Sequence, residues 1–203
     1  MIADHPECRI VCITEHWKSE EELKYMSLKD FNLTASYCRE SNKHGGSAVY
    51  VHKSIKGQTR IFFSKFSIKY QIEIAAMECD LQGELVLVLS VYRPSGANIE
   101  IFFDRFESLL SAVMKENKVV IVAGDFNVEM LKNNANKEDF GALLESFGLK
   151  QTIFENTRIS KKSSSCIDNI FVNLDNIVHS VVLHTFTSDH TAQKLTFKIK
   201  KTL

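Results

Sequence analysis

The stretch that most constrains the fold is residues 118–127, with the sequence Lys-Val-Val-Ile-Val-Ala-Gly-Asp-Phe-Asn. Its four consecutive β-branched residues form a run too short for a membrane span and well suited to a strand buried on both faces. Gly124 closes the run and lets another group approach the backbone. Asp125 and Asn127 follow two residues apart, so an extended backbone directs both side chains to the same side. The run predicts a central strand that ends in a polar pair.

This polar pair has two interpretations. A carboxylate can orient or deprotonate a water molecule, and a carboxamide can hold a phosphate oxygen, so the pair suits phosphoester chemistry. Gly-Asp-Phe-Asn is equally an ordinary turn sequence after a core strand. These four residues leave both interpretations open, and the rest of the chain has to decide between them.

The bulk properties bound the class of protein. The 203 residues suffice for one domain, which we expect to span residues 1–203. Lysine plus arginine equal aspartate plus glutamate at 25 each, so any grip on nucleic acid must come from a local patch. Five scattered cysteines without metal-ligand spacing predict a reducing, intracellular location, in the nucleus or the cytoplasm. We identify no signal peptide and no membrane span in the sequence.

Hydrophobic patterning predicts more strands than helices. Strands are expected at residues 9–14, 31–37, 47–52, 72–76, 84–92, 118–127, 166–172, 178–183 and 194–199. Helices are expected from a capping box at Ser19 to about Met26, from a cap at Asn98 through Val113, and over residues 137–147. Because the strands come mostly in hairpins and the helices are few, the pattern favours two mixed or antiparallel sheets with outer helices over a doubly wound parallel sheet.

Several polar residues share one property, which is that each lies at or beside the end of an apolar strand. They are Glu15, Tyr92, Asp125, Asn127, Asp168, Ser188, Asp189 and His190. Taken singly, each has an ordinary structural explanation, such as a surface turn for His190 or a cap for Asp189. Together they indicate a hydrolytic site for a phosphoester. Carboxylates would hold a hard cation such as Mg²⁺, and a further acid would orient a histidine toward the phosphate.

The order of the motifs extends this interpretation. It runs Ile-Thr-Glu at 13–15, Gly-Gly at 45–46, Val-Tyr-Arg-Pro at 91–94, Gly-Asp-Phe-Asn at 124–127, Ile-Asp-Asn-Ile-Phe at 167–171 and Ser-Asp-His at 188–190. This series resembles the endonuclease/exonuclease/phosphatase superfamily, which includes DNase I-like enzymes and apurinic endonucleases. The residues at 91–94 (Val-Tyr-Arg-Pro), 156–158 (Asn-Thr-Arg) and 188–193 (Ser-Asp-His-Thr-Ala-Gln) resemble in particular the endonuclease domain of jockey-like non-LTR retrotransposons. The resemblance covers about residues 8–199. It implies an α/β fold, a four-layer sandwich of two packed mixed or antiparallel β-sheets flanked by helices.

The resemblance also implies roles for the polar residues at the centre of the site. Asp125 matches the aspartate that positions or activates the attacking water, and Asn127 matches the amide that steadies the phosphate. His190 matches the histidine that stabilises the pentavalent transition state, and Asp168 matches the acid that orients this histidine. Tyr92 matches a tyrosine that bonds the phosphate.

Four further residues receive metal-binding or supporting roles from the resemblance. Glu15 matches the metal-binding glutamate, and Asp189 matches an aspartate with a role in metal binding or proton transfer. Thr157 and Ser188 match supporting hydroxyls. In the family a strand carrying a metal-associated asparagine, and then a helix, precede the glutamate strand, whereas here Glu15 is the fifteenth residue. We therefore expect an N-terminally truncated fold that lacks one inner strand and leaves a neighbouring strand edge exposed or differently covered.

The function implied is a Mg²⁺-dependent phosphodiesterase, with Mn²⁺ as a substitute, that nicks target DNA for target-primed reverse transcription. DNA is then the partner, together with a reverse-transcriptase module in a full-length element, and no membrane is involved. Two alternatives stay open, namely a catalytically inactive binding domain of the same fold and a phosphatase acting on a small-molecule or lipid phosphoester. Lys161 and Lys162, beside three serines, form either a DNA-backbone contact or a solvated turn.

Overall fold

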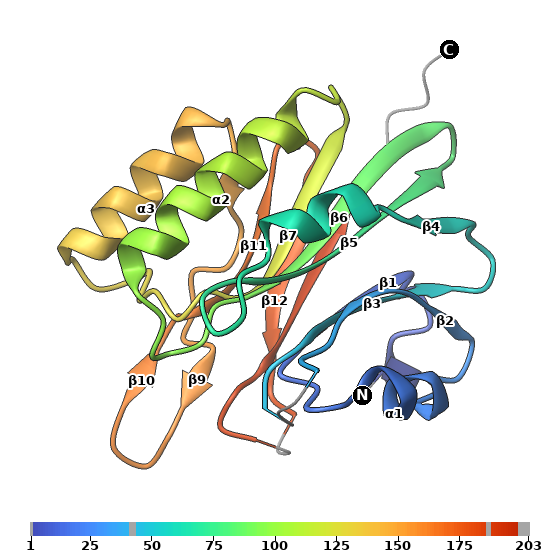
Figure 1. Ribbon diagram of the computed structural model, residues 1–203, viewed down its shortest axis with the longest axis horizontal. Helices are drawn as coiled ribbons and strands as arrows, with labels where there is room; N and C mark the ends of the chain where they lie inside the picture. Colours follow the sequence, from blue (N-terminus) through green and yellow to red (C-terminus); the bar gives the residue numbers. More distant parts are fainter. Residues whose placement is uncertain (1, 41–43, 186–187, 199–203) are drawn as a thin grey trace.

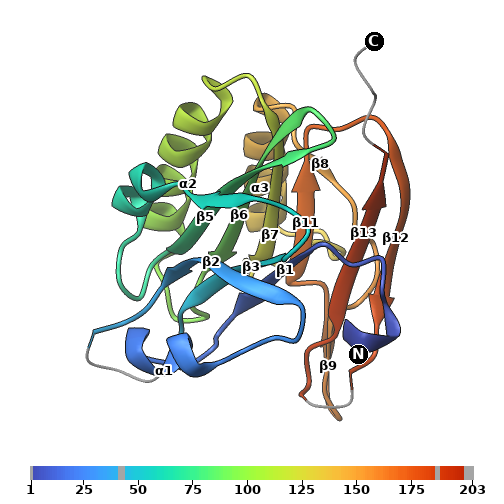
Figure 2. The same cartoon turned by 90° about the vertical axis from the view of Figure 1, so that its right-hand side faces the viewer.

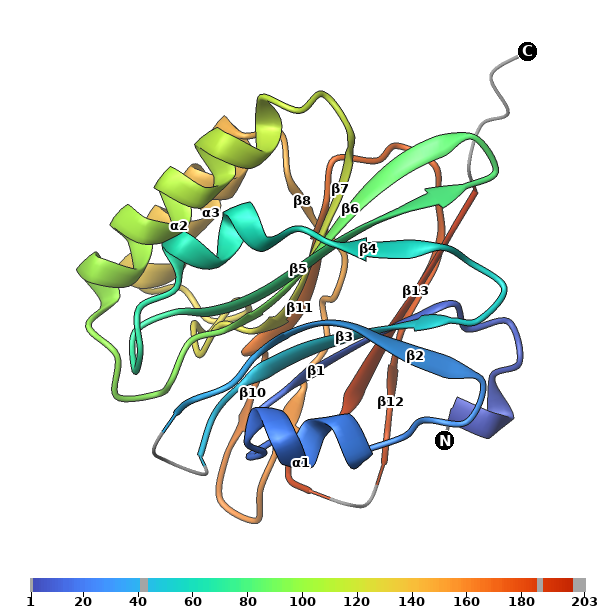
Figure 3. The same ribbon diagram turned by 45° about the vertical axis from the view of Figure 1, so that its right-hand side comes forward.

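The computed structural model describes residues 2–40, 44–185 and 188–198. Its elements stack as helices, sheet, sheet and helix, as Figure 3 shows from the helices at upper left to α1 at the bottom. Three separate clusters of buried apolar side chains fill the interfaces between successive layers. The structure therefore has the four-layer α/β architecture predicted from the sequence.

The larger sheet has six strands in the order β4-β5-β6-β7-β11-β8. Their bounds are β4 Gly57–Thr59, β5 Glu73–Leu81, β6 Glu84–Tyr92, β7 Val119–Asp125, β8 Lys150–Gln151 and β11 Asp168–Val172. Only β6 and β7 run parallel, because α2 (Ile99–Met114) lies between them in the chain and returns it to the same end of the sheet. Together with α3 (Ala135–Ser146), α2 covers one face of this sheet (Figure 1).

Strand β7 is buried on both faces, as its β-branched run predicts. Val120 and Val122 belong to the cluster under α2 and α3, whereas Ile121 and Ala123 belong to the cluster under the second sheet layer. Alternate residues of a strand point to opposite faces, so both faces of β7 are covered by apolar side chains. This strand is the centre of the sandwich.

The second sheet layer has two parts. Strands β1 (Ile10–Thr14), β3 (Ser47–His52) and β2 (Phe31–Tyr37) form a three-stranded antiparallel sheet. Strands β12 (Ile177–Leu183) and β13 (Ala192–Phe197) form a separate antiparallel ribbon beside β1 (Figure 2). No strand within the described residues joins β1 to β13, so each presents an unpaired edge.

The small elements complete the fold. Helix α1 (Glu20–Tyr25) has the predicted capping box between Ser19 and Glu22, and its Leu23 packs under the outer face of β1-β3-β2. Short 3₁₀ helices lie at Ile2–Asp4 (η1) and Ile61–Phe66 (η2), and two-residue strands β9 (Arg158–Ile159) and β10 (Ser164–Ser165) form a hairpin. None of the described helices has the length and apolarity needed to cross a membrane.

Several boundaries differ from those expected. Strand β5 spans Glu73–Leu81 rather than 72–76, and strand β7 ends at Asp125 rather than at residue 127, because the chain turns at Asn127 with a φ of 48°. Helix α3 begins at Ala135 rather than at residue 137, because the Asn134 side chain accepts from the Lys137 N–H as its cap. Strand β11 begins at Asp168 rather than at residue 166, because the Cys166 and Ile167 carbonyls accept backbone N–H groups from the turn after β7. Strand β13 spans Ala192–Phe197 rather than 194–199, and residue 199 lies outside the described residues.

Candidate active site

The register of the central sheet brings three polar residues to one rim. Because β6 and β7 are parallel, their last residues, Tyr92 and Asp125, lie side by side. Because β11 runs antiparallel to β7, its first residue, Asp168, is also the direct neighbour of Asp125. Tyr92 and Asp168 are 33 and 43 positions from Asp125 in the sequence, and strand pairing alone therefore places both beside it.

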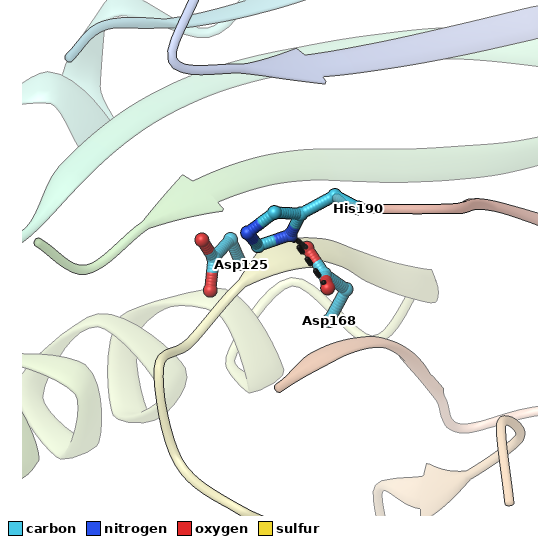
Figure 4. A group of neighbouring side chains, drawn as sticks. All are labelled: Asp125, Asp168 and His190. Carbon is cyan, nitrogen blue, oxygen red and sulfur yellow. Dashed lines mark hydrogen bonds and ion pairs between the residues drawn. The ribbon is translucent and has the colours of Figure 1, made fainter. Parts of the chain in front are cut away.

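His190 completes this group from the segment before β13. Its Nδ1 lies 3.1 and 3.0 Å from the two oxygens of Asp168. Figure 4 shows the imidazole between the two aspartates, with its second nitrogen on the side of Asp125. One ligand atom from each of Asp125, Asp168 and His190 lies within 4.8 Å of the others. The carboxylate of Asp168 thus fixes the ring, and the free nitrogen faces the site.

Thr157 holds Asp168 and the His190 segment together. Its hydroxyl accepts the backbone N–H groups of Ile167 and Asp168 at 3.1 and 3.0 Å, and the residue is fully buried. Its carbonyl accepts the Thr191 N–H at 2.7 Å, beside the bridge between Arg158 and His190. Thr157 therefore contacts backbone on both sides of the Asp168–His190 pair, through its hydroxyl beside Asp168 and through its carbonyl beside His190.

The electrostatics of the group follow from burial and crowding. Asp125 is only 4% exposed, and burial, reinforced by the charge of Asp168, raises the pKa of the Asp125 carboxyl. The hydrogen bond to Asp168 raises the pKa of His190 above that of a free imidazole, although burial opposes it. The pairing with Asp168 therefore favours the protonated form of His190 beside a buried acid.

Glu15 and Tyr92 face each other on the same rim. The Tyr92 hydroxyl donates to Oε1 of Glu15, which is exposed directly after β1. Burial, together with this bond, raises the pKa of the Tyr92 phenol, so the hydroxyl remains a donor. Glu15 also contributes to the raised pKa of Asp125, which places the Glu15 carboxylate within electrostatic reach of the buried acid.

The turn that carries Asn127 is held by Arg93. The Arg93 guanidinium donates to the Asn127 and Ala97 carbonyls at 3.1 and 2.7 Å, and the Arg93 carbonyl accepts from Nδ2 of Asn127 at 2.7 Å. The Asn127 N–H donates to Oδ1 of Asp125 at 2.9 Å. Asp125 and Asn127 therefore adopt the turn that the sequence allowed, and this turn is built into the site.

The remaining predicted residues lie at the edge of the group. The Asp189 carboxylate accepts from Nε of Arg158 at 2.8 Å, and this bond lowers the pKa of Asp189. The Ser188 hydroxyl exchanges hydrogen bonds with the backbone of His190, at 3.0 Å from the N–H and 3.1 Å from the carbonyl. Ser188 thus shapes the backbone of the histidine, whereas Asp189 pairs with an arginine outside the Asp125–Asp168–His190 group.

Sequence reasoning gave no role to three residues that the structure places around the site. Arg93 is buried beneath the Asp125–Asn127 turn, and Arg39 and Glu73 form a buried ion pair behind Glu15. The only sequence signal for Arg93 is its place next to Tyr92. Arg39 and Glu73 are 34 positions apart, so no local pattern reveals them.

The donor set suits a hard divalent cation. Oxygen atoms of carboxylates are the ligands that Mg²⁺ prefers, and Glu15 is exposed to the water molecules that this ion keeps. Burial raises the pKa of Asp125, the charges of Asp168 and Glu15 add to this effect, and a bound cation would relieve the repulsion between these acids. The residues present therefore fit a metal held by Glu15 beside Asp125.

Comparison with solved structures identifies the class of fold. The endonuclease domain of TRAS1, a telomere-specific non-LTR retrotransposon, matches with a TM-score of 0.74 at 16% identity, over 98% of this chain and 90% of that chain. The 3′-5′ exonuclease NExo from Neisseria meningitidis matches with a TM-score of 0.72 at 15% identity, over 98% and 92%. The Xenopus laevis APE2 catalytic domain matches with a TM-score of 0.71 at 14% identity, over 97% and 85%. The fold is that of the DNase I-like endonuclease/exonuclease/phosphatase superfamily.

Comparison of the sequence with protein families assigns the chain to a narrower group than the fold does. The family described as endonuclease-reverse transcriptase matches residues 86–193, which is more than half of the chain. The chain therefore belongs to this family, and the matched segment contains Tyr92, Asp125, Asp168 and His190. No curated protein matches the sequence.

Proposed function

We propose that the chain is a Mg²⁺-dependent phosphodiesterase that nicks DNA, as the endonuclease of a non-LTR retrotransposon. The observation that carries the proposal is the Asp168–His190 pair directed at Asp125 on the rim where Tyr92 and Glu15 also meet. This arrangement supplies an oriented histidine, a buried acid and a carboxylate for a cation. Membership of the endonuclease-reverse transcriptase family, and the likeness to a retrotransposon endonuclease domain, support DNA as the substrate.

The proposed division of labour follows from the contacts. Asp125 orients and deprotonates the attacking water, and Asn127, fixed against Arg93, steadies the phosphate. His190, held by Asp168, donates a hydrogen bond to the phosphate oxygens as their negative charge grows in the transition state. A hydroxyl donor from Tyr92 adds to this stabilisation.

Glu15 would hold the divalent cation, with Asp189 as the second acid near the rim. When bound, such an ion acts as a Lewis acid on the phosphate and favours the charged form of nearby carboxylates. The exposure of Glu15 allows a hydrated ion to reach it from solvent.

The β9–β10 hairpin is the proposed DNA contact. Lys161 and Lys162 are exposed between the two strands, at the tip of the hairpin that projects at the bottom of Figure 1. The hairpin begins at Arg158, which bridges His190 through the backbone, so it leaves the molecule beside the site. Two lysines and an arginine there would bind the phosphate backbone without reading sequence.

We also propose an intracellular, reducing setting, in the nucleus or the cytoplasm. All five cysteines are free thiols, and burial raises the pKa of Cys79 to about 11 and of Cys166 to about 12. Such thiols are mostly protonated and unreactive at neutral pH. A reverse-transcriptase module is the partner proposed for a full-length element.

The substrate class can be tested with a labelled DNA duplex and a phosphomonoester in parallel. We expect Mg²⁺-dependent cleavage of the duplex, lost in Asp125→Asn and in His190→Ala by roughly 10²-fold or more. Asp175→Asn and His179→Ala, which alter exposed residues away from the site, should cleave as the wild type does. Release of phosphate from the monoester without cleavage of the duplex would refute the nuclease proposal in favour of a phosphatase.

A further inference from the structure

Glu15 adopts an unusual backbone conformation that its neighbours must impose. Its φ is 53°, and that of Trp17 is 55°, in the left-handed region that residues with a Cβ avoid. The N–H of Glu15 donates to the Gly46 carbonyl at 2.9 Å, and the N–H of Trp17 donates to the Gly45 carbonyl at 3.0 Å. The Gly45–Gly46 turn therefore determines where the Glu15 side chain leaves the backbone.

A buried ion pair fixes that turn. The Gly46 N–H donates to Oε2 of Glu73 at 2.6 Å, and Nε of Arg39 donates to Oε1 of the same carboxylate at 2.6 Å. The two side chains are 6% and 0% exposed. A Cβ on Gly45 would lie 2.4 Å from Cζ of Arg39, so the guanidinium packs directly on the turn.

Glu73 also lies next to Tyr92, the residue that binds the Glu15 side chain. Strands β5 and β6 pair Glu73 directly with Tyr92, whose hydroxyl donates to Glu15. The carboxylate of Glu73 is thus adjacent both to the turn that sets the Glu15 backbone and to the strand end that binds the Glu15 side chain.

A contribution to folding stability does not by itself explain the buried ion pair between Arg39 and Glu73. A buried ion pair must recover the cost of removing two charges from water, and apolar replacements of such pairs often stabilise a protein. Glu73 and Arg39 do not belong to the Asp125–Asp168–His190 group, and both are covered from solvent, so neither reaches a substrate. What they do contact is the turn that orients Glu15.

We propose that Glu73 and Arg39 are positioning residues that hold the Gly45–Gly46 turn and thereby set Glu15 to bind a divalent cation. This inference rests on the proposed role of Glu15 as a metal ligand. Outer groups that orient a metal ligand typically change metal affinity by roughly 10- to 100-fold when they are altered. Glu73→Gln and Arg39→Lys should weaken binding by about that factor.

The test is a titration of the purified chain with Mn²⁺, in which electron paramagnetic resonance reports the free ion without any need for activity. Glu73→Gln and Arg39→Lys should bind Mn²⁺ more weakly, and added Mn²⁺ should restore their nicking rate to that of the wild type. Glu78→Gln is the matched control, because Glu78 lies on the same strand in ion pairs with Arg60 and Lys118, away from Glu15. Its Mn²⁺ affinity should match that of the wild type.

The variant Glu15→Gln distinguishes a failure of the positioning inference from a failure of the proposed metal site. If Glu15→Gln weakens Mn²⁺ binding while Glu73→Gln and Arg39→Lys do not, the positioning inference is overturned and the proposed metal site stands. If Glu15→Gln binds as tightly as the wild type, both are overturned. Should Glu73→Gln fail to fold, Arg39→Lys decides, since it keeps the buried positive charge but replaces the planar guanidinium that donates to Glu73 and packs on Gly45.

Discussion

Replacing Gly124 by alanine tests whether the close approach of β6 and β7 sets the geometry of the site. A Cβ at this position would lie 1.8 Å from the Val91 carbonyl oxygen, whereas real Cβ atoms essentially never approach closer than 3.0 Å. The two strands would have to separate by about 1.2 Å. Ladder hydrogen bonds of ordinary length would then break. Separation would also pull Tyr92 away from Asp125.

The expected loss of unfolding free energy follows from the hydrogen bonds between β6 and β7 that would break. Losing two ladder bonds and leaving their buried groups unpaired costs about 3–5 kcal/mol, against a gain of roughly 0.4–1 kcal/mol from the stiffer unfolded chain. Urea unfolding followed by circular dichroism measures the difference. Gly141→Ala is the control, because nothing lies near that position in α3 and alanine there should stabilise by roughly 0.5–1 kcal/mol. A Gly124→Ala variant as stable as the wild type would refute the reasoning.

Three further perturbations test other parts of the account. Thr157→Val leaves the buried N–H groups of Ile167 and Asp168 without an acceptor, so it should destabilise by about 2–4 kcal/mol in urea unfolding and reduce nicking; an effect below that of the half-buried Thr34→Val would contradict this. Phe140→Ala should cost about 3–5 kcal/mol, because the fully buried ring packs on five other phenylalanines; an unchanged midpoint would show that the cluster does not stabilise the fold. His190 has a raised pKa, so its pairing with Asp168 stabilises the metal-free protein fully below about pH 6.5 and loses this effect as the pH rises through the folded pKa. The difference in unfolding free energy between the wild type and His190→Gln should therefore shrink toward alkaline pH, and a constant difference would argue against the pair.

The strands and caps with strong local signals were predictable. The β-branched run before Gly124 specified a strand buried on both faces, and Ser19 with Glu22 and Asn98 alone specified the starts of α1 and α2. Asn134 was missed as a cap because it lies in a polar stretch that also reads as a loop. Strands β4, β8, β9 and β10 were missed because two or three partly exposed residues carry no periodic pattern.

The predicted residues of the site lie where strand ends meet, and strand ends can be read from a sequence. Asp125, Asp168 and His190 come together because sheet register joins them, as the strand-end pattern indicated. Partners supplied by distant segments could not be found this way. The pairing of Asp189 with Arg158, and that of Arg39 with Glu73, depend on tertiary packing that leaves no local trace.

Nicking of supercoiled plasmid by the purified chain tests the central claim most directly. We expect conversion to open circles in Mg²⁺, none in EDTA, and none by an Asp125→Ala variant whose circular dichroism matches that of the wild type. That result would establish a metal-dependent nuclease that works through the buried acid at the end of β7. Nicking that persists in EDTA or in Asp125→Ala, or no nicking by well-folded wild-type protein, would contradict the account.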